Sequence, residues 1–404
     1  MRKYSDAVSN QPEYPNPMTK KLLFISKDSN WQLYRNEVLT KFANEYNVEV
    51  EILTTGTLKN HLKENSRLHY KIFHNFFRQS GKCSFFPGAI RYILKTKPDV
   101  VLALNNTTQL TEYLALFICK LMGIKFVWWT HGFNHHQLKN QFFQSIKKKY
   151  ALSFLSKGDS IITFSPAGKD YLVKNNIRAA KIFTASNTLD TDKLKKLKKS
   201  LSVNFNKEQF LLSKFPDYKE SADSVVLLFS GRLNINKKVD NAIRTVKLLN
   251  DRGVCARLLI VGDGKEKEAL VTLAASLNLH DRIYFAGSVF GDELVTPYFL
   301  ASDLFIMPGY IGLAIVHAFA FDLPVITEDI KIHSPEIQYL KPGVNGCFVK
   351  ENNAADMADT IMAINNDHTY LNKLKRGTKE SVSNEANIHK MLSNMNAALF
   401  RDRV

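Results

Sequence analysis

Residues 225–240 read VVLLFSGRLNINKKVD: an apolar run, a basic loop and the start of an amphipathic segment. The apolar run predicts a buried strand, and the apolar positions between Val239 and Leu249 fall on one face of a predicted helix. A strand, a loop and a helix in this order form a common phosphate site, because the free N–H groups and the dipole at a helix start attract anions. In the loop, Arg232 can hold two phosphate oxygens at once, and Lys237 adds a compact charge.

Strand–helix units of the same kind repeat through the second half of the chain. Short apolar runs ended by turn residues predict further strands at Arg257–Val261, Arg282–Ala286, Leu304–Met307 and Leu323–Thr327. Such strands, separated by helical patterns, are typical of a parallel sheet covered on both faces. The second half therefore predicts a doubly wound domain.

The first half shows the same alternation less regularly. Strands are predicted at Leu22–Ser26, Val48–Leu53, Asp99–Leu104, Lys125–Thr130, Ser160–Phe164 and Lys181–Ala185. We expect a polar tail at 1–20, a first domain at 21–205, a second domain at 206–385 and a C-terminal helix at 386–404, for which packing back on the first domain is one option. The expected fold class is α/β, with two doubly wound Rossmann-like domains facing a cleft and ligands at the carboxyl ends of the strands.

Charge is divided unevenly along the 404 residues. Residues 1–200 carry 32 Lys and Arg against 14 Asp and Glu, a net +18, whereas residues 201–404 carry 23 against 24, a net −1. The basic half predicts an anionic partner: nucleic acid, an acidic membrane surface or a phosphate-bearing substrate. The aromatic and basic stretches Phe76–Arg91 and Phe142–Lys149 favour the membrane surface, although core Phe and solvated Lys are the commoner arrangement for any single helix.

The sequence favours a cytoplasmic location, peripheral on the inner face of the cell membrane. The first twenty residues lack the apolar core of a secretory signal. The apolar stretch Tyr113–Trp129 is interrupted by Lys120 and Lys125, so we expect a buried helix followed by a strand there and no membrane span. The four cysteines are scattered and predict neither a disulfide framework nor a metal site.

Six segments together carry a family resemblance. In chain order they are Asn187–Asp190, Gly231–Asp240, Ile260–Gly264, Phe285–Gly287, Gly312–Ile326 and Gly343–Gly346. Their order and spacing resemble the retaining glycosyltransferases of the GT-B fold usually called family 4, the glycosyl transferases group 1. The resemblance covers residues 225–365 well and residues 20–190 less closely.

The resemblance implies a set of site residues. The expected catalytic residues are Arg232, Lys237, His131 and Glu336. The expected donor-binding residues are Gly231, Gly262, Asp263, Gly264, Gly309, Ile311, Gly312, Leu313, His317 and Asn187. No metal is expected, because the two cations of the basic loop and the helix start at Gly312-Leu313 would neutralise the leaving diphosphate. Purely structural alternatives stay open for several of them: surface charge for Arg232 and Lys237, a turn for His131, a helix-start carboxylate for Glu336, tight turns for Gly262 and Gly264, and a helix cap for Asp263.

Two positions depart from the family pattern. The family has glutamates where this sequence has Gly309 and His317. The second glutamate normally holds the ribose, and a histidine can still hydrogen-bond a hydroxyl. The first lies near the donor sugar, and glycine has no side chain to replace it. The glycine-rich turn after the first strand is also absent, since residues 26–30 read SKDSN. We interpret the chain as a subfamily with another arrangement.

The predicted function is transfer of a sugar from a nucleotide-sugar donor, UDP- or GDP-linked, to a glycan or polyprenyl-linked acceptor in surface polysaccharide biosynthesis, without a cofactor or a metal. One alternative is a nucleotide-sugar epimerase or hydrolase of the same fold. Another is a catalytically degenerate partner subunit that binds a nucleotide sugar. Nucleic acid is not an expected partner, because no recognition motif accompanies the basic residues.

Overall fold

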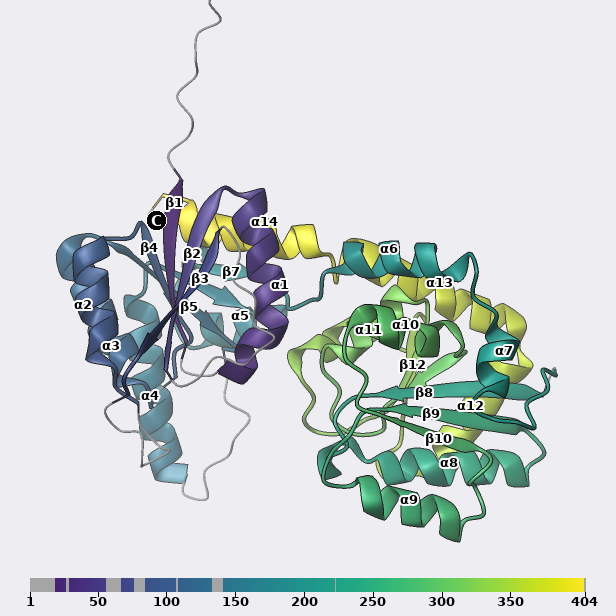
Figure 1. Ribbon diagram of the computed structural model, residues 1–404. Helices are drawn as coiled ribbons and strands as arrows, with labels where there is room; N and C mark the ends of the chain where they lie inside the picture. The colour runs from purple at the N-terminus through teal and green to yellow at the C-terminus, as the bar shows by residue number, and fades with distance from the viewer. Residues whose placement is uncertain are drawn as a thin grey trace, which may run out of the picture.

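The computed structural model describes residues 19–26, 29–55, 67–75, 84–106, 108–132, 141–221 and 223–402, and it contains two α/β domains (Figure 1). The first sheet is parallel, in the order β3-β2-β1-β4-β5-β6-β7. Its strands are β1 (Lys20–Ile25), β2 (Val48–Thr55), β3 (Leu68–Phe73), β4 (Val100–Ala103), β5 (Lys125–Thr130), β6 (Ser160–Thr163) and β7 (Ile182–Thr184). The expected α/β class with two doubly wound domains is confirmed, although β3 was not among the predicted strands.

Helices cover both faces of the first sheet. On one face lie α1 (Ser29–Glu45) and the last helix, α14 (Ile388–Phe400), whose apolar residues share a core with β1, β2 and β5. On the other face lie α2 (Pro87–Thr96), α3 (Leu110–Met122), α4 (Gln141–Lys157) and α5 (Pro166–Lys174). The C-terminal helix therefore completes the core of the first domain. Within the described ranges, no helix is both long and apolar enough to cross a bilayer.

The second sheet is also parallel, in the order β10-β9-β8-β11-β12-β13. Its strands are β8 (Ser224–Ser230), β9 (Cys255–Val261), β10 (Ile283–Gly287), β11 (Leu304–Ile306), β12 (Val325–Glu328) and β13 (Gly346–Val349). The helices around it are α7 (Lys207–Leu212), α8 (Val239–Asp251), α9 (Lys267–Ser276), α10 (Asp292–Leu300), α11 (Ala314–Ala320), α12 (Ala354–Asn366) and α13 (His368–Asn384). Figure 1 shows α8 and α9 on one side of this sheet and α10 and α11 on the other.

The chain enters the second domain before residue 205, the predicted end of the first domain. Helix α6 (Thr191–Ser202) packs on α10 and α11, and Leu194 belongs to the core of the second domain. The sequence of α6 is rich in lysine because its exposed face carries the charges. Two of these lysines are ion-paired: Lys193 with Asp292 at 2.5 Å, and Lys198 with Asp322.

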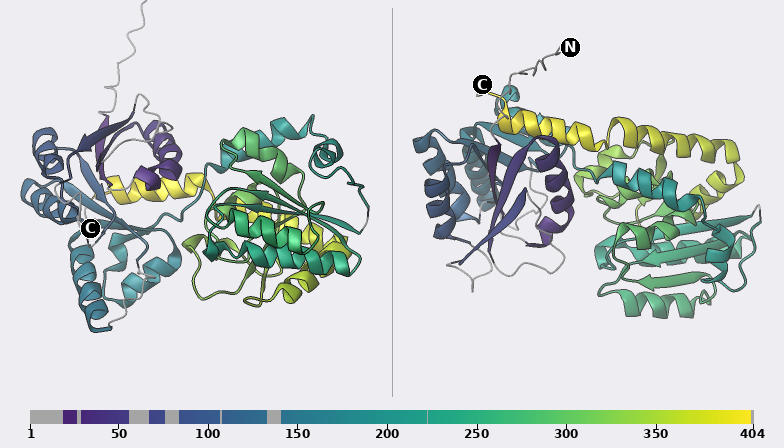
Figure 2. Two further views of the ribbon diagram at one scale, coloured as in Figure 1. Left: turned by 60° about the horizontal axis from the view of Figure 1, so that its bottom comes forward. Right: turned by 45° about the horizontal axis from the view of Figure 1, so that its top comes forward.

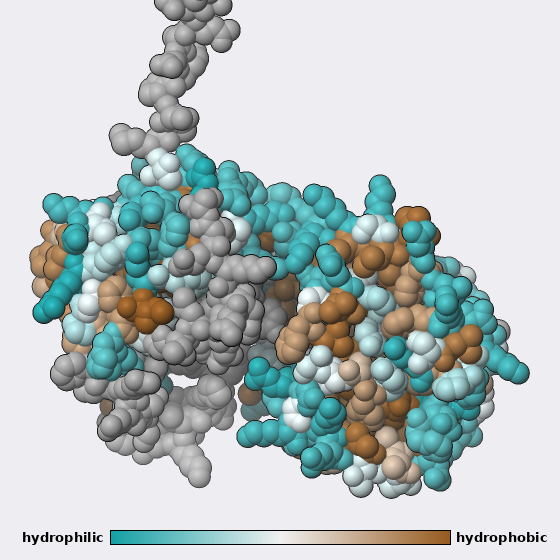
Figure 3. All heavy atoms as spheres, in the orientation of Figure 1, coloured by the Kyte–Doolittle hydropathy of each residue, from teal (hydrophilic) through white to brown (hydrophobic). Residues whose placement is uncertain are grey.

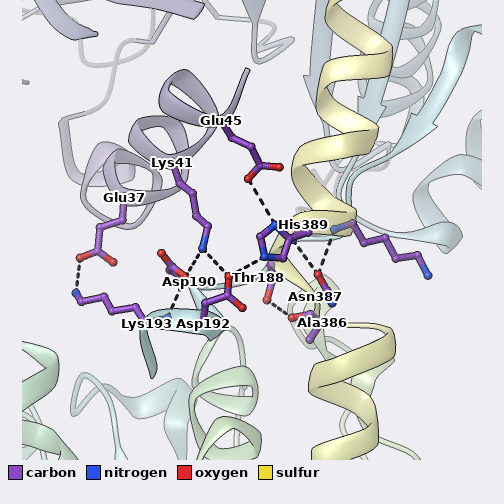
Figure 4. Close-up of polar contacts among 11 residues, drawn as sticks. Glu37, Lys41, Glu45, Thr188, Asp190, Asp192, Lys193, Ala386, Asn387 and His389 are labelled. Atoms are coloured by element: carbon purple, nitrogen blue, oxygen red, sulfur yellow. Dashed lines mark hydrogen bonds and ion pairs between the residues drawn. The ribbon is translucent and has the colours of Figure 1, made fainter. Parts of the chain in front are cut away.

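The domains are joined twice, once before α6 and once between α13 and α14, which run end to end across the two domains (Figure 2). A polar network lies at this junction (Figure 4). The Nζ of Lys41 lies 2.9 Å from Asp190 and 2.7 Å from Asp192, and the Nε2 of His389 lies 2.8 Å from Asp192. Thr188 donates to a backbone carbonyl of the α13–α14 connection at 2.8 Å. These contacts tie α1 and α14 to the start of α6.

Candidate functional site

The switch point of the second sheet lies between β8 and β11, where the strand order reverses direction. In doubly wound sheets, ligands bind outside the carboxyl ends of the strands at this point. Gly231 and Arg232 follow β8, and Gly309 and Ile311 follow β11 shortly after its end. The structure thus brings four of the predicted site residues, from two separate segments, to one edge of the sheet.

The loop between β8 and α8 is fixed against the end of β11. Its short 3-10 helix, η2 (Ile235–Lys237), carries Lys237. The backbone carbonyl of Lys237 accepts a hydrogen bond from the N–H of Gly309 at 3.0 Å. The Lys237 ammonium donates to the backbone carbonyl of Tyr310 at 2.5 Å. This anchoring holds the ammonium at the switch point before any ligand arrives.

Burial and charge act on the Lys237 ammonium together. Burial, followed by the positive charge of Arg232, lowers the pKa of Lys237 to about 8, against the opposing effect of the Glu336 carboxylate. The Arg232 side chain itself is exposed. Arg232 and Lys237 are two neighbouring positive charges, and the Lys237 ammonium is largely removed from water. A bound diphosphate would stabilise both charges.

Glu336 lies at the boundary of the two domains, on the 3-10 helix η3 (Pro335–Tyr339). Its side chain is buried, with a residue exposure of 3%. The carboxylate accepts hydrogen bonds from Asn187 of the first domain and from Ser334. A Cβ atom placed on Gly312 would lie 3.9 Å from its Oε2, so the carboxylate faces the start of α11. The structure therefore brings together three predicted site residues: Glu336, Asn187 and Gly312.

Arg35 is a functional candidate that the sequence did not reveal. It lies on α1 and is 5% exposed. Its guanidinium lies 4.5 Å from the ring centre of Trp129 and 4.7 Å from that of Phe164. Burial lowers the pKa of Arg35 to about 9, and the charge of Glu336 works against that effect. A single arginine in a helix forms no pattern, and the one available signal was its place in the helix that follows the first strand.

His131 shares an aromatic neighbour with Arg35. Its ring centre lies 4.5 Å from that of Phe164, and its side chain is exposed at the end of β5. The structure therefore places the imidazole at the carboxyl edge of the first sheet, as expected from its position. Two further histidines of this segment, His135 and His136, lie outside the described residues.

His333 was also missed and holds the loop after β11 in place. Its Nδ1 accepts a hydrogen bond from the N–H of Ile311 at 3.3 Å, and its Nε2 lies 2.9 Å from the carbonyl of Glu328. Nε2 is therefore the protonated nitrogen. Burial is the largest effect on His333 and lowers its pKa, which favours this neutral form. The Ile311 side chain is fully buried in the core, so this residue can meet a ligand only through its backbone.

Close backbone packing explains the predicted glycines. A Cβ atom on Gly262 would lie 1.9 Å from the carbonyl oxygen of Gly231, and one on Gly264 would lie 2.2 Å from that of Leu233. Gly262 also has a φ of 142°, which side chains rarely adopt. Asp263 accepts from the N–H of Gly264 at 2.7 Å and pairs with Lys267 at 2.9 Å. Gly262 and Gly264 pack the turns after β8 and β9 closely together, in agreement with the tight-turn alternative, whereas the N-cap of α9 is Glu266 and not Asp263.

The two positions that depart from the family pattern have different surroundings. At Gly309 a Cβ atom would lie 2.1 Å from the carbonyl oxygen of Asn236, so the fold leaves no room for any side chain. The His317 ring stacks on Phe299 at 4.2 Å and lies 5.6 Å from Phe321. Among the described residues, the buried Nε2 of His317 has no hydrogen-bond partner. Burial lowers its pKa to about 4, so the imidazole is neutral at physiological pH.

Two protein families match the chain, one for each domain. The model of Glycosyltransferase Family 4 matches residues 38–193, and the model of glycosyl transferases group 1 matches residues 213–381. A D-inositol 3-phosphate glycosyltransferase of Nocardia farcinica is 31% identical over 37% of this chain, and the match spans 34% of that protein, about a third of its length. An uncharacterized glycosyltransferase of Haemophilus influenzae is 24% identical over 68% of this chain and 69% of its own.

Solved structures share the fold over nearly the whole chain. Anabaena HepE in complex with UDP superposes with a TM-score of 0.68 at 17% identity, covering 93% of this chain and 98% of HepE. A glycosyltransferase of Rickettsia africae gives a TM-score of 0.72 at 19% identity, covering 94% and 98%. WaaG, a glycosyltransferase involved in lipopolysaccharide biosynthesis, gives 0.64 at 13% identity, covering 94% and 100%. The two family matches, one on each domain of a shared fold, show that this chain belongs to the GT-B glycosyltransferases of the family 4 type.

Proposed function

We propose that the protein transfers a sugar from a UDP- or GDP-linked donor to a glycan or polyprenyl-linked acceptor, with retention of the anomeric configuration. The observation that carries this proposal is the convergence of Lys237, Arg232 and Glu336 at the switch point of the second sheet, opposite Arg35 and Asn187 of the first domain. Fixed cations in a site partly shielded from water can stabilise the negative charge of a leaving diphosphate.

In the proposed reaction the bond between the sugar C1 and the phosphate oxygen breaks, and its electron pair stays on the diphosphate. Arg232 and Lys237 stabilise that negative charge without help from a metal. The acceptor hydroxyl attacks the same face of the sugar, and its proton passes to the donor phosphate. No covalent bond to the protein is required. The buried carboxylate of Glu336, flanked by cations, would hydrogen-bond sugar hydroxyls as the ring becomes positively charged.

The proposals for the acceptor and the pathway rest on solved structures of the same fold and on the charge of the first half of the chain. Relatives on the same fold include WaaG and a lipopolysaccharide outer core galactosyltransferase, WaaB. We infer a role in surface polysaccharide biosynthesis, with the protein on the inner face of the cell membrane. The basic first half of the chain supports an anionic acceptor or surface.

The test begins with the thermal stability of the purified protein against UDP, GDP, dTDP and CMP and their sugars. A ligand present at a hundred times its Kd adds about 2.7 kcal/mol to the free energy of unfolding. We expect one base to shift the melting temperature selectively, and the matching sugar donor then to be consumed only with acceptor. Product formation from the donor alone would point to the epimerase or hydrolase. A shift without turnover in the presence of acceptor would favour the degenerate partner subunit, and absence of any shift would contradict a transferase that binds its donor alone.

A further inference from the structure

The outer face of α3 is apolar and exposed. Leu110, Leu114, Phe117 and Leu121 recur at intervals of four, three and four residues, which places them on one side of the helix. Phe117 is 59% exposed and Leu121 is 70% exposed. The sequence predicts a buried helix here, and the structure corrects this: the inner face is buried, but no element of the described residues covers the outer face. A helix that is apolar all round is normally enclosed by other elements.

Neighbouring helices extend this apolar face. Helix α2 packs beside α3 and exposes Leu94. On the other side, Tyr113 of α3 contacts the ring of Tyr150 at 5.5 Å, which joins α3 to α4, and α4 exposes Tyr150 and Ile146. Figure 3 shows hydrophobic side chains gathered at the margin of the first domain where α2 and α3 lie. A contiguous group of this kind marks an interaction surface.

Positive charge lies on the same three helices as the apolar face. The sequences of α2, α3 and α4 contain seven cations: Arg91, Lys95, Lys120, Lys147, Lys148, Lys149 and Lys157. Their one carboxylate is Glu112, which is fully buried and accepts backbone hydrogen bonds from Leu104 and Asn106. Burial raises the pKa of Glu112 to about 8. The exposed surface of these three helices thus carries cations and apolar groups but no exposed carboxylate.

The apolar stripe begins at the edge of the sheet where the candidate site lies. Leu110 opens α3 a few residues after the end of β4, at the carboxyl edge. His131 follows β5 at the same edge. A lipid-linked acceptor held at this face would therefore have its head group near the domain boundary.

We propose that the outer face of α3, with the flanking cations of α2 and α4, inserts into an anionic phospholipid surface. The inference rests on the proposed function, because a lipid-linked acceptor supplies the reason for docking. Apolar side chains enter the acyl boundary while lysines meet the phosphate groups, as in other interfacial helices. A second copy of the chain is a poorer occupant, because a two-fold interface would bring seven cations against seven.

The experiment is co-sedimentation of the full chain with vesicles of phosphatidylcholine alone or mixed with phosphatidylglycerol. We expect binding to the mixed vesicles only, weakening as salt is raised. The double variant Phe117→Gln/Leu121→Gln should bind at least about tenfold more weakly, because it removes two inserted apolar groups. The triple variant Lys95→Gln/Lys120→Gln/Lys149→Gln should lose about fivefold per lysine.

Matched controls come from the second domain. Leu212→Gln/Val271→Gln changes two exposed apolar residues there, and Lys219→Gln/Lys350→Gln changes two exposed lysines. Both should bind vesicles as the unchanged protein does. Equal binding by the α3 variant, or no binding by the unchanged protein, would overturn the proposal.

Light scattering tests the remaining possibility, that the α3 face binds a second copy of the chain. A dimer that the α3 variant dissociates would overturn the membrane surface in favour of a second copy. Nucleotide-dependent thermal shifts, measured without vesicles, should be the same in every variant. An α3 variant that loses vesicle binding but keeps the nucleotide-dependent thermal shift would show that the α3 face is the membrane contact. Vesicle binding without any nucleotide-dependent thermal shift would contradict the proposed function alone.

Discussion

The side-chain amide of Asn187 donates a hydrogen bond to the carboxylate of Glu336 and thereby links the two domains. The hydroxyl of Tyr339 donates to the backbone carbonyl of Asn187 at 3.0 Å, which reinforces the contact. Arg35 of the first domain and Lys237 of the second act on the same carboxylate through their charges. Glu336 therefore has its full set of partners only when the domains meet.

The contact can be tested with a double-mutant cycle. Asn187→Ala leaves the buried Glu336 carboxylate without one of its two side-chain donors, so we expect a loss of about 1–3 kcal/mol in stability and slower transfer. Glu336→Gln should also slow transfer, and the double variant should lose less than the sum of the single losses. Urea unfolding and initial rates give these values. Strict additivity would show that the two residues do not cooperate, and exposed Lys331→Ala serves as the control.

Removal of either phosphate-binding cation should nearly abolish transfer. We expect Arg232→Ala and Lys237→Ala each to lower the transfer rate by about 100-fold or more, because each removes a charge aimed at the leaving diphosphate. The exposed Lys265→Ala should have little effect. Rates in the presence of EDTA should be unchanged if these cations replace a metal. Unchanged transfer in both alanine variants would refute the assignment.

Nucleotide binding should depend on pH through Lys237. Its pKa is about 8 in the folded protein, below the ordinary 10.5. Free protein loses the Lys237 charge as pH rises through about 8, whereas a bound diphosphate would restore it, so binding above that pH takes up a proton. Between about pH 8 and pH 10.5, Lys237 is more protonated in the unfolded chain than in the folded protein. Lys237 therefore raises the free energy of unfolding as pH rises through this range. Calorimetry in buffers of different ionisation enthalpy measures the number of protons taken up on nucleotide binding. Lys237→Arg should abolish this proton uptake.

Restoring the family glutamate at position 309 should damage the protein. Gly309→Glu, and already Gly309→Ala, would place a Cβ atom 2.1 Å from the carbonyl oxygen of Asn236. We expect a loss of about 1–3 kcal/mol from overpacking, measured by thermal unfolding. Gly312→Ala is the matched control, because its nearest neighbour would be an ordinary 3.5 Å away. A stable and more active Gly309→Glu variant would show that the loop can move aside.

Substitution of His317 separates packing from ligand binding. Its folded pKa of about 4 lies below the ordinary 6.5, so the unfolded chain binds more protons between these values. The protein should therefore lose stability as pH falls from about 6.5 to about 4. His317→Phe should keep the stack on Phe299 and remove this part of the pH dependence. If His317 also holds the ribose, the variant will bind nucleotide more weakly at neutral pH; unchanged affinity assigns the residue to packing alone.

Local patterns in the sequence were sufficient for most of the second domain. The strands around Val225–Phe229 and Leu304–Met307 were predicted because buried parallel strands are short, apolar and ended by turn residues. Strand β3 was missed because LHYKIF mixes polar and apolar residues at the edge of its sheet. The predicted boundary at 205 leaves α6 in the first domain, because nothing in a lysine-rich helix shows which core its few leucines enter.

The two doubly wound sheets and the basic loop of Arg232 and Lys237 can be predicted from the amino-acid sequence, because they depend on periodicity and on residues close in the chain. The hydrogen bond from Asn187 to Glu336 and the electrostatic effect of Glu336 on Arg35 emerge only in the folded chain, because these residues come from elements far apart in sequence and no local pattern records such an interaction. The same holds for Gly309, where a side chain is excluded by a loop more than seventy residues earlier in the chain. It also holds for α3, since its sequence shows an apolar helix but only the packing shows which face stays exposed.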